Sequence, residues 1–368
     1  MNTLPKFASN KDNNNTYNTT MSNKIVTFGE ILLRLTPPGY MKFSQSNSIR
    51  ATFGGSETNV AVSLAHLGLD SEFITRLPNN DIAQSCVMDL RSHGVKTENI
   101  IYGGERLGLY YFENTSSQRA AKVVYDRANS AYCTITPGMV DWEKVFDGAD
   151  WFHWSGIAPS LSQSAADTTI EAINMAEKKG LTISADLNFR KNLWNYGKKA
   201  EEVMPQLAKH CHVLFGTEGE YEKTFGVKPV GYSATNVDDP INIDAFEHFC
   251  RSIMDKAPKC EKMFIALRNV LNANKHILTG ILYTREGKLY KGRTNLIEHV
   301  VDCVGVGDAF AAGMIYGIKN YPDDNQKCLE FAIAASTLKN TISGDYNLVS
   351  AEEVKALMNG DGSGRISR

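Results

Sequence analysis

The feature that most constrains the fold is a repeated alternation of short apolar runs with segments of helical periodicity. Strands are expected in six apolar runs, at residues 24–30, 71–77, 151–157, 181–186, 213–215 and 263–267. Helical segments lie between them, and three of these segments end at a glycine, namely Gly68, Gly94 and Gly180. Strands that alternate with helices favour a mainly parallel sheet covered on both faces, so we predict an α/β fold.

Two stretches break this alternation, residues 31–51 and 107–125. Both contain short runs typical of strands, so we expect β-rich insertions outside the main layer. They are compatible with a small β-sheet lid over the strand ends, and equally with an extra hairpin at the edge of the main sheet.

The size and composition of the chain limit its organisation. A chain of 368 residues suits one large α/β domain or two modest ones. Residues 1–22 are rich in Asn and Thr, so we expect a flexible tail there, a folded domain over 23–358 and a second flexible tail over 359–368.

Charge, cysteine content and hydropathy indicate which partners and which cellular location to expect. A net charge of −2 gives no indication of nucleic acid or a membrane surface as a partner. Seven dispersed cysteines without C-x-x-C pairs fit reduced thiols. No apolar run reaches the roughly 20 residues of a membrane span. We therefore expect a cytoplasmic protein.

A glycine loop near the C-terminal end carries the clearest chemical signal. The run from Val301 to Gly313 passes through Gly305-Val306-Gly307-Asp308 and is expected to be helical from Asp308 onward. Glycine permits a tight path with positive φ, and the free amides at a helix N-terminus bind anions. Asp308 would repel a phosphate there unless it accepts a proton from an attacking hydroxyl or orients a metal ion; a simple helix N-cap is the alternative.

Two motifs in this chain resemble signatures of one enzyme family. Residues 302–313 are similar to the D-T-V-G-A-G-D-[AS]-F-x-x-G signature of the ribokinase-like (PfkB-type) carbohydrate kinases, with Cys303 in place of Thr and Val306 in place of Ala. Residues 54–61 resemble the N-terminal G-G-x-x-x-N-x-A signature of the same family. The resemblance covers about residues 24–356 and implies a three-layer αβα sandwich with a mainly parallel central sheet and a small β-sheet lid.

The resemblance also implies an ATP-dependent kinase with assigned residues around the phosphates. Gly305, Val306 and Gly307 would form the anion hole, with Asp308 as catalytic base. Thr217 and Glu220 match a motif, N-x-x-E, whose Glu places Mg²⁺ through water, although Thr217 replaces the usual Asn. Further nucleotide-side assignments are Arg268 near the phosphates, residues 336–344 as a wall of the adenine pocket, and Asp302 as the residue that orders the loop and is a candidate for holding a monovalent cation.

Within the family, the chain looks most like the 2-keto-3-deoxygluconate kinases. The matching stretches are 28–30, 108–110, 125–131, 155–159, 186–190 and 193–194. By this resemblance the substrate is a sugar acid, and it would be contacted by Gly55, Asn59, Tyr110, Tyr125, Arg127, Ile157 and Arg190. A carboxylate needs a cation, and Arg recognises it with two parallel hydrogen bonds. Arg190 follows a strand end, which favours the functional role, whereas for Arg127 a structural ion pair is an equal alternative.

Other readings of the sequence stay open. A fructokinase or other neutral-sugar kinase would give Arg127 and Arg190 no anion to bind. A non-catalytic sugar-binding regulatory protein is opposed by the intact Asp308 but favoured by Thr217, and a nucleoside kinase is a weaker alternative. The edges of a β-sheet lid often pair, so a homodimer or a higher homo-oligomer is the expected assembly.

Overall fold

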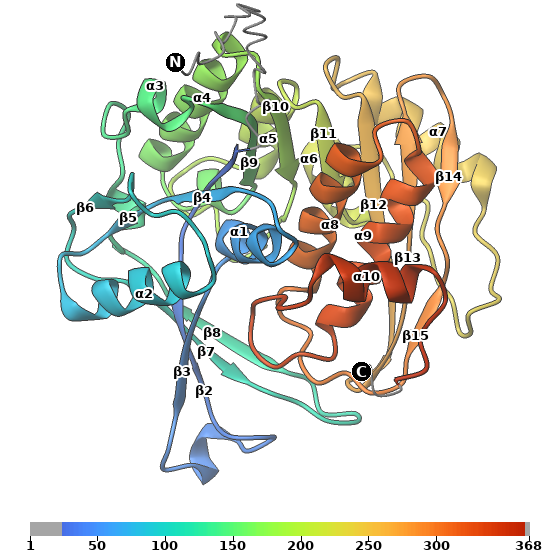
Figure 1. Ribbon diagram of the computed structural model, residues 1–368, viewed down its shortest axis with the longest axis horizontal. Coiled ribbons are helices and arrows are strands. Elements are labelled where there is room, and N and C mark those ends of the chain that lie inside the picture. The colour runs from blue at the N-terminus through green and yellow to red at the C-terminus, as the bar shows by residue number, and fades with distance from the viewer. Residues whose placement is uncertain (1–23, 365–368) are drawn as a thin grey trace, which may run out of the picture.

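The computed structural model describes residues 24–364 and contains a nine-stranded mixed sheet at its centre (Figure 1). Six strands run parallel in the order β12-β11-β10-β9-β1-β4, and β13, β14 and β15 extend the sheet in antiparallel pairs. The strands are β1 (Lys24–Phe28), β4 (Ser71–Ile74), β9 (Ala149–Ser155), β10 (Thr182–Asp186), β11 (Val213–Gly216), β12 (Lys262–Asn272), β13 (Lys275–Thr284), β14 (Leu289–Lys291) and β15 (Asn295–Ile297). The predicted mainly parallel sheet is confirmed.

Helices cover both faces of this sheet, and each face has its own apolar core. One face carries α1 (Ser56–His66), α8 (Val306–Asn320), α9 (Asn325–Lys339) and α10 (Ala351–Met358). The other face carries α3 (Trp142–Val145), α4 (Gln163–Lys178), α5 (Ala200–Ala208), α6 (Glu218–Phe225) and α7 (Ile243–Met254). A further helix, α2 (Asp81–Ser92), packs with α1 near β4 in a third cluster. The expected three-layer αβα arrangement is therefore present.

The two β-rich insertions form one separate four-stranded sheet. Its order is β3-β2-β7-β8, with β2 (Leu32–Thr36) and β3 (Arg50–Gly54) from the first insertion and β7 (Gly108–Glu113) and β8 (Lys122–Asp126) from the second. Strands β2 and β7 pair in parallel, which joins the two insertions. Figure 1 shows this sheet projecting from the lower edge of the main body, so it is not a hairpin added to the main sheet.

Two local predictions were wrong. The single strand expected over residues 71–77 is divided into β4 in the main sheet and β5 (Arg76–Leu77), which pairs with β6 (Ile101–Tyr102). The strand expected over residues 263–267 continues to Asn272, because it forms a long antiparallel hairpin with β13 that the local pattern does not reveal.

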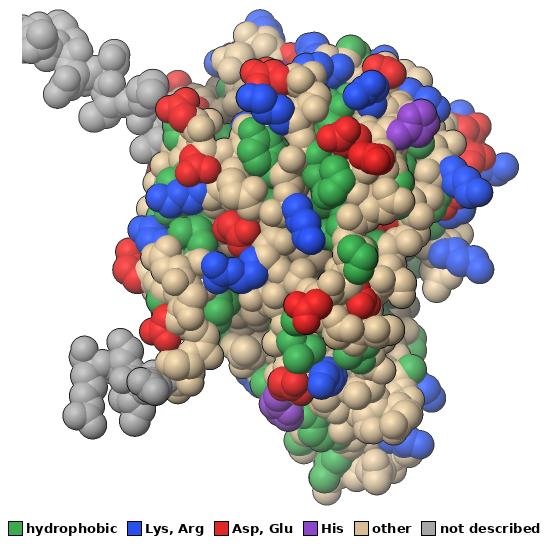
Figure 2. All heavy atoms as spheres, turned by 90° about the vertical axis from the view of Figure 1, so that its right-hand side faces the viewer, with side chains coloured by type: hydrophobic (Ala, Val, Ile, Leu, Met, Phe, Trp, Pro, Cys, Tyr) green, Lys and Arg blue, Asp and Glu red, His purple; other side chains and the backbone are tan. Residues whose placement is uncertain are grey.

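Three further observations on the described residues concern the cysteines, possible membrane spans and surface charge. All seven cysteines are free. Over residues 24–364, no helix is both long and apolar enough to cross a membrane. On the face shown in Figure 2, basic and acidic side chains are interspersed. The predicted flexible tail at 1–22 lies outside the described residues, as do 365–368 of the C-terminal tail.

Candidate active site

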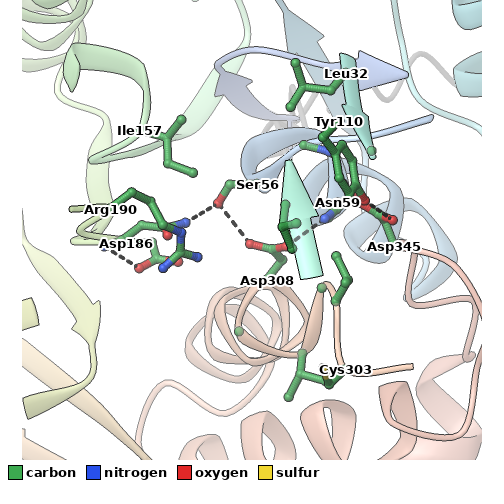
Figure 3. Close-up of a pocket in the computed structure, with 18 of the residues that line it drawn as sticks. Leu32, Ser56, Asn59, Tyr110, Ile157, Asp186, Arg190, Cys303, Asp308 and Asp345 are labelled. Carbon is green, nitrogen blue, oxygen red and sulfur yellow. Dashed lines mark hydrogen bonds between the residues drawn. The ribbon is translucent and has the colours of Figure 1, made fainter. Parts of the chain in front are cut away.

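One cavity of about 490 Å³ lies between the carboxyl ends of the parallel strands, the start of α8 and the small sheet (Figure 3). Ligands of open α/β sheets bind at this edge. The cavity is lined by most of the residues that the sequence predicts for the site: Gly55, Asn59, Tyr110, Tyr125, Arg127, Ile157, Arg190, Thr217, Glu220, Arg268, Gly305, Val306, Gly307 and Asp308. Of the segment 336–344, predicted as a wall of the adenine pocket, only Ser336 lines this cavity, and Asp302 does not line it. Strands β2, β7 and β8 of the small sheet contribute Leu32, Tyr110 and Tyr125, so this sheet forms a wall over the cavity.

The glycine loop leads directly into α8. Gly305 is the N-cap, with φ of 82°, and a Cβ there would lie 2.0 Å from the carbonyl oxygen of Asp345. Both the left-handed conformation and the close approach require glycine. The first intrahelical bond runs from the Ala309 amide to the Gly305 carbonyl at 2.9 Å. The amides of Val306 to Asp308 therefore come before the hydrogen-bonded part of the helix, as an anion site requires.

The start of α8 corrects the expected position of Asp308. The helix begins at Val306, so Asp308 is its third residue and Gly305 occupies the N-cap position. The alternative role of Asp308 as an N-cap is thereby removed. At Gly307 an added Cβ would meet nothing nearer than Phe215, at 4.0 Å, so the loop has open space on that side.

The Asp308 carboxylate is buried and held by two side chains of α1. Ser56 Oγ donates to one carboxylate oxygen at 2.9 Å, and Asn59 Nδ2 donates to the other at 2.7 Å (Figure 3). Burial raises the pKa of Asp308 to about 6, and the hydrogen bonds from Asn59 and Ser56 partly offset that rise. At neutral pH the carboxylate is mostly ionised and close to its pKa, which suits a general base.

Three residues predicted to contact the sugar already make close contacts within the protein. Asn59 accepts from the Gly55 amide at 3.2 Å as well as donating to Asp308. The Tyr110 hydroxyl donates to the Asp345 carboxylate, at 2.6 and 2.7 Å from its two oxygens. At Gly55 a Cβ would lie 2.2 Å from the Glu30 carbonyl oxygen, so chain packing alone explains that glycine. Their contacts with a sugar stay predictions.

The two candidate arginines differ in their availability for a substrate carboxylate. The Arg127 guanidinium is buried and donates to one Glu30 oxygen at 2.8 Å from Nε and 2.5 Å from Nη2. Its charge is thus matched within the protein. The Arg190 side chain is 48% exposed and approaches Glu220 only to 3.7 Å, which leaves it free to bind an anion in the cavity.

Acidic groups gather on the side of the cavity near β10 and α6. Thr217, the N-cap of α6, donates to Glu220 through its amide and its hydroxyl, at 2.7 and 2.9 Å. Burial raises the pKa of Asp186 well above its usual value, and the charges of Glu220 and Asp308 raise it further. A divalent cation beside Asp186 and Glu220 would relieve this repulsion. Within residues 24–364 no group of three or more His, Cys, Asp or Glu side chains is arranged to hold a metal, so such an ion would need water and phosphate ligands as well, as Mg²⁺ commonly has.

Several lining residues were missed by the sequence analysis. Ser56 holds Asp308 and itself accepts a hydrogen bond from Asn188 Nδ2 at 2.9 Å. Asp186 and Asn188 lie at and just past a strand end, a position that could have flagged them. Asp345 bonds Tyr110 from 235 residues away in the sequence and has no local pattern that points to the site.

Known carbohydrate kinases are similar to this chain in sequence and in fold. The family described as pfkB family carbohydrate kinase matches residues 22–240. A curated 2-dehydro-3-deoxygalactonokinase from Haloferax volcanii is 27% identical over 94% of this chain and 99% of its own length. The 2-dehydro-3-deoxygluconokinase of Bacillus subtilis is 28% identical over 80% of this chain and 82% of its own.

A solved structure gives a closer match. The crystal structure of 2-dehydro-3-deoxygluconokinase from Thermotoga maritima is 40% identical and covers 92% of this chain and 99% of its own, with a TM-score of 0.83. The chain therefore belongs to the pfkB family of carbohydrate kinases. It is a sugar kinase, a phosphotransferase that uses an alcohol group as acceptor, and is most similar to 2-dehydro-3-deoxygluconokinases.

Proposed function

We propose that this kinase uses ATP with Mg²⁺ to phosphorylate the terminal hydroxyl of 2-keto-3-deoxygluconate, which is 2-dehydro-3-deoxygluconate under another name. The observation that carries the proposal is the position of Asp308. Its buried, hydrogen-bonded carboxylate lies on the first turn of a helix whose free amides face a cavity of about 490 Å³. A base next to an anion site is what transfer of a phosphoryl group to a hydroxyl requires.

The proposed chemistry follows from these side chains. The sugar hydroxyl gives its proton to a carboxylate oxygen of Asp308 as the oxygen attacks the terminal phosphorus of ATP. Ser56 and Asn59 keep the carboxylate aimed into the cavity. The amides of Val306 and Gly307 stabilise the negative charge on the phosphoryl oxygens, and this electrostatic positioning is the main source of catalysis in such reactions.

Asp186 and Glu220 are the residues that would hold Mg²⁺, through water and the phosphates. The ion would neutralise phosphate charge when bound. Arg268 on β12 also lines the cavity and is exposed, so it is available to the nucleotide phosphates.

The choice of a sugar acid rests on Arg190. Its half-exposed guanidinium lines the cavity and approaches the Glu220 carboxylate only to 3.7 Å, so it is available to pair with a substrate carboxylate. The names of the relatives support the same class, since both are kinases of 2-dehydro-3-deoxy sugar acids. These two acids differ in the configuration of one carbon, so the galactonate epimer is the second candidate substrate.

The test is ADP release by the purified protein with ATP and Mg²⁺, comparing 2-keto-3-deoxygluconate, its galactonate epimer, fructose and ribose. We expect a preference of at least about 100-fold in kcat/KM for a sugar acid, because a neutral sugar leaves the Arg190 cation without its charged hydrogen-bonded partner. Turnover of fructose or ribose alone would keep the kinase but reject the acid substrate. No turnover with any of the four would favour a sugar-binding protein without catalysis.

A further inference from the structure

A buried cluster of charges lies directly behind the glycine loop. Arg34, on strand β2 of the small sheet, donates to Asp302 at 2.7 Å and to Asp345 at 2.8 Å. Lys339, the last residue of α9, has no exposed surface. Its ammonium donates to the backbone carbonyl of Ile342 at 3.0 Å and to that of Asp302 at 3.4 Å.

With both carboxylates ionised, this cluster is electrically neutral when Lys339 carries its proton. Two cations, Arg34 and Lys339, face two carboxylates, Asp302 and Asp345. The pKa of Lys339 is lowered overall, because burial and the charge of Arg34 outweigh the opposite effect of Asp302 and Asp345. Without the ammonium, one buried carboxylate would lack a counter-charge, and it lies next to the loop proposed to bind phosphate. Buried unpaired charges are strongly unfavourable.

The Lys339 side chain also lies close to the loop itself. A Cβ added to Gly305, the N-cap of α8, would lie 3.3 Å from Cε of Lys339. Ser336, on the same helix as Lys339, donates to the Val306 carbonyl at 2.8 Å. Helix α9 therefore holds the anion-hole loop from behind with one hydroxyl and one positive charge.

The monovalent cation expected beside Asp302 does not fit this arrangement. The carbonyl oxygens that would bind it, those of Asp302 and Ile342, already accept from Lys339. The Asp302 carboxylate is also occupied, by Arg34 and by the amides of Val304 and Gly344, each at 3.0 Å. The position is filled by a side chain of the protein.

We propose that Lys339 is a positioning residue that supplies a permanent monovalent positive charge behind the anion hole, so that this kinase needs no K⁺ or other monovalent cation. The inference rests on the proposed role of the loop from Gly305 to Asp308 in binding phosphate. A tethered ammonium orders the loop in the absence of ligand and adds its charge to that of the free amides.

The test compares the full-length wild-type protein with Lys339→Ala and Lys339→Met in tetramethylammonium, Na⁺, K⁺ and NH₄⁺ chloride at equal ionic strength. For the wild type we expect kcat to agree within about twofold across the four salts. In tetramethylammonium both variants should lose at least about tenfold in kcat, since the charge behind the loop is absent. Lys339→Ala also opens space beside the two carbonyls, so K⁺ or NH₄⁺ should restore at least about tenfold to it.

Lys327→Met is the matched control, because Lys327 lies exposed on the first turn of the same helix. It should behave as the wild type does in all four salts. Thermal unfolding gives a readout that needs no turnover: K⁺ should raise the Tm of Lys339→Ala, relative to tetramethylammonium, and leave those of the wild type and of Lys327→Met unchanged.

Several-fold stimulation of the wild type by K⁺ would overturn the proposal, and this measurement decides the question even if neither Lys339 variant folds. Full kcat of Lys339→Ala in tetramethylammonium would overturn it as well. If no sugar is phosphorylated in any salt, the proposed function fails, whereas the Tm response to K⁺ still tests the charge at Lys339.

Discussion

Replacing Asp308 by Asn separates the chemical role of the carboxylate from its effect on stability. The amide has nearly the same shape and can still accept from Asn59 while its own NH₂ donates to Ser56, so the local structure should persist. It cannot take a proton from the sugar hydroxyl. We expect kcat to fall by about 10²- to 10⁴-fold, the usual contribution of a general base, with little change in sugar binding.

The same substitution should stabilise the folded protein at high pH. The pKa of Asp308 is raised from the usual 3.8 to about 6, so the folded state binds this proton more tightly than the unfolded state does. The free energy of unfolding therefore falls as the pH rises from about 4 to about 6, by about 3 kcal/mol in total. The neutral amide of the variant carries no such penalty, so Asp308→Asn should unfold at higher temperature than the wild type at pH 8, with the gap closing near pH 4.

Two assays check both parts of this reasoning. The kcat/KM of the wild type should decline about tenfold per pH unit below the pKa of Asp308, which is about 6. Thermal unfolding of both proteins between pH 4 and pH 8 gives the difference in stability. Asp323→Asn, at an exposed loop position, is the control and should change neither quantity. Near-wild-type kcat in Asp308→Asn would refute the catalytic role, and a destabilised variant at pH 8 would refute the argument from burial.

Further substitutions test the surroundings of Asp308 and the ion pairs. Asn59→Ala removes one bond that lowers the pKa of Asp308, so the acid limb of the pH–kcat/KM profile should move up by about one pH unit; an unmoved limb would argue against this positioning. Arg127→Met leaves Glu30 buried without its cation and should cost about 3–5 kcal/mol of stability by denaturant unfolding, most of it restored by adding Glu30→Gln if the role is structural. Arg190→Met should raise KM for the sugar acid by at least about tenfold and leave any neutral-sugar turnover unchanged, and equal losses on both would exclude carboxylate recognition. Glu220→Gln should raise the Mg²⁺ concentration for half-maximal rate several-fold, and an unchanged Mg²⁺ titration would remove Glu220 from the metal site.

The parts of this protein that the sequence predicts well depend on local patterns. The alternation of strands and helices defines the central sheet because hydrophobic periodicity and glycine stops are local signals. The loop at Gly305 is recognisable for the same reason, since a left-handed residue before a helix needs glycine. With the end of each strand located, the common edge of a parallel sheet brings Ile157 and Arg190 to the same cavity.

The features that the sequence does not predict depend on contacts between residues that lie far apart in the chain. From the sequence, Arg127 is equally compatible with a substrate contact and with a structural ion pair. The structure shows that its charge is matched by Glu30, which lies 97 residues earlier in the chain. The sequence predicts Asn59 as a sugar contact, but does not show that one of its two amide N–H groups donates to Asp308, 249 residues later. A side chain's availability for a ligand is set by what else it touches, and that information is absent from local sequence.

The contacts of Arg34 link the small sheet to the glycine loop. This residue belongs to β2 of the sheet that covers the cavity, yet its two carboxylate partners are Asp302, which opens the glycine loop, and Asp345, whose carbonyl oxygen packs against Gly305. Tyr110, on the adjacent strand β7, bonds the same Asp345 carboxylate. The sheet that lines the cavity and the loop proposed to bind phosphate thus share one buried ionic cluster. A displacement of the small sheet would have to break these bonds or carry the loop with it, so Arg34 couples the position of the small sheet to that of the loop proposed to bind phosphate.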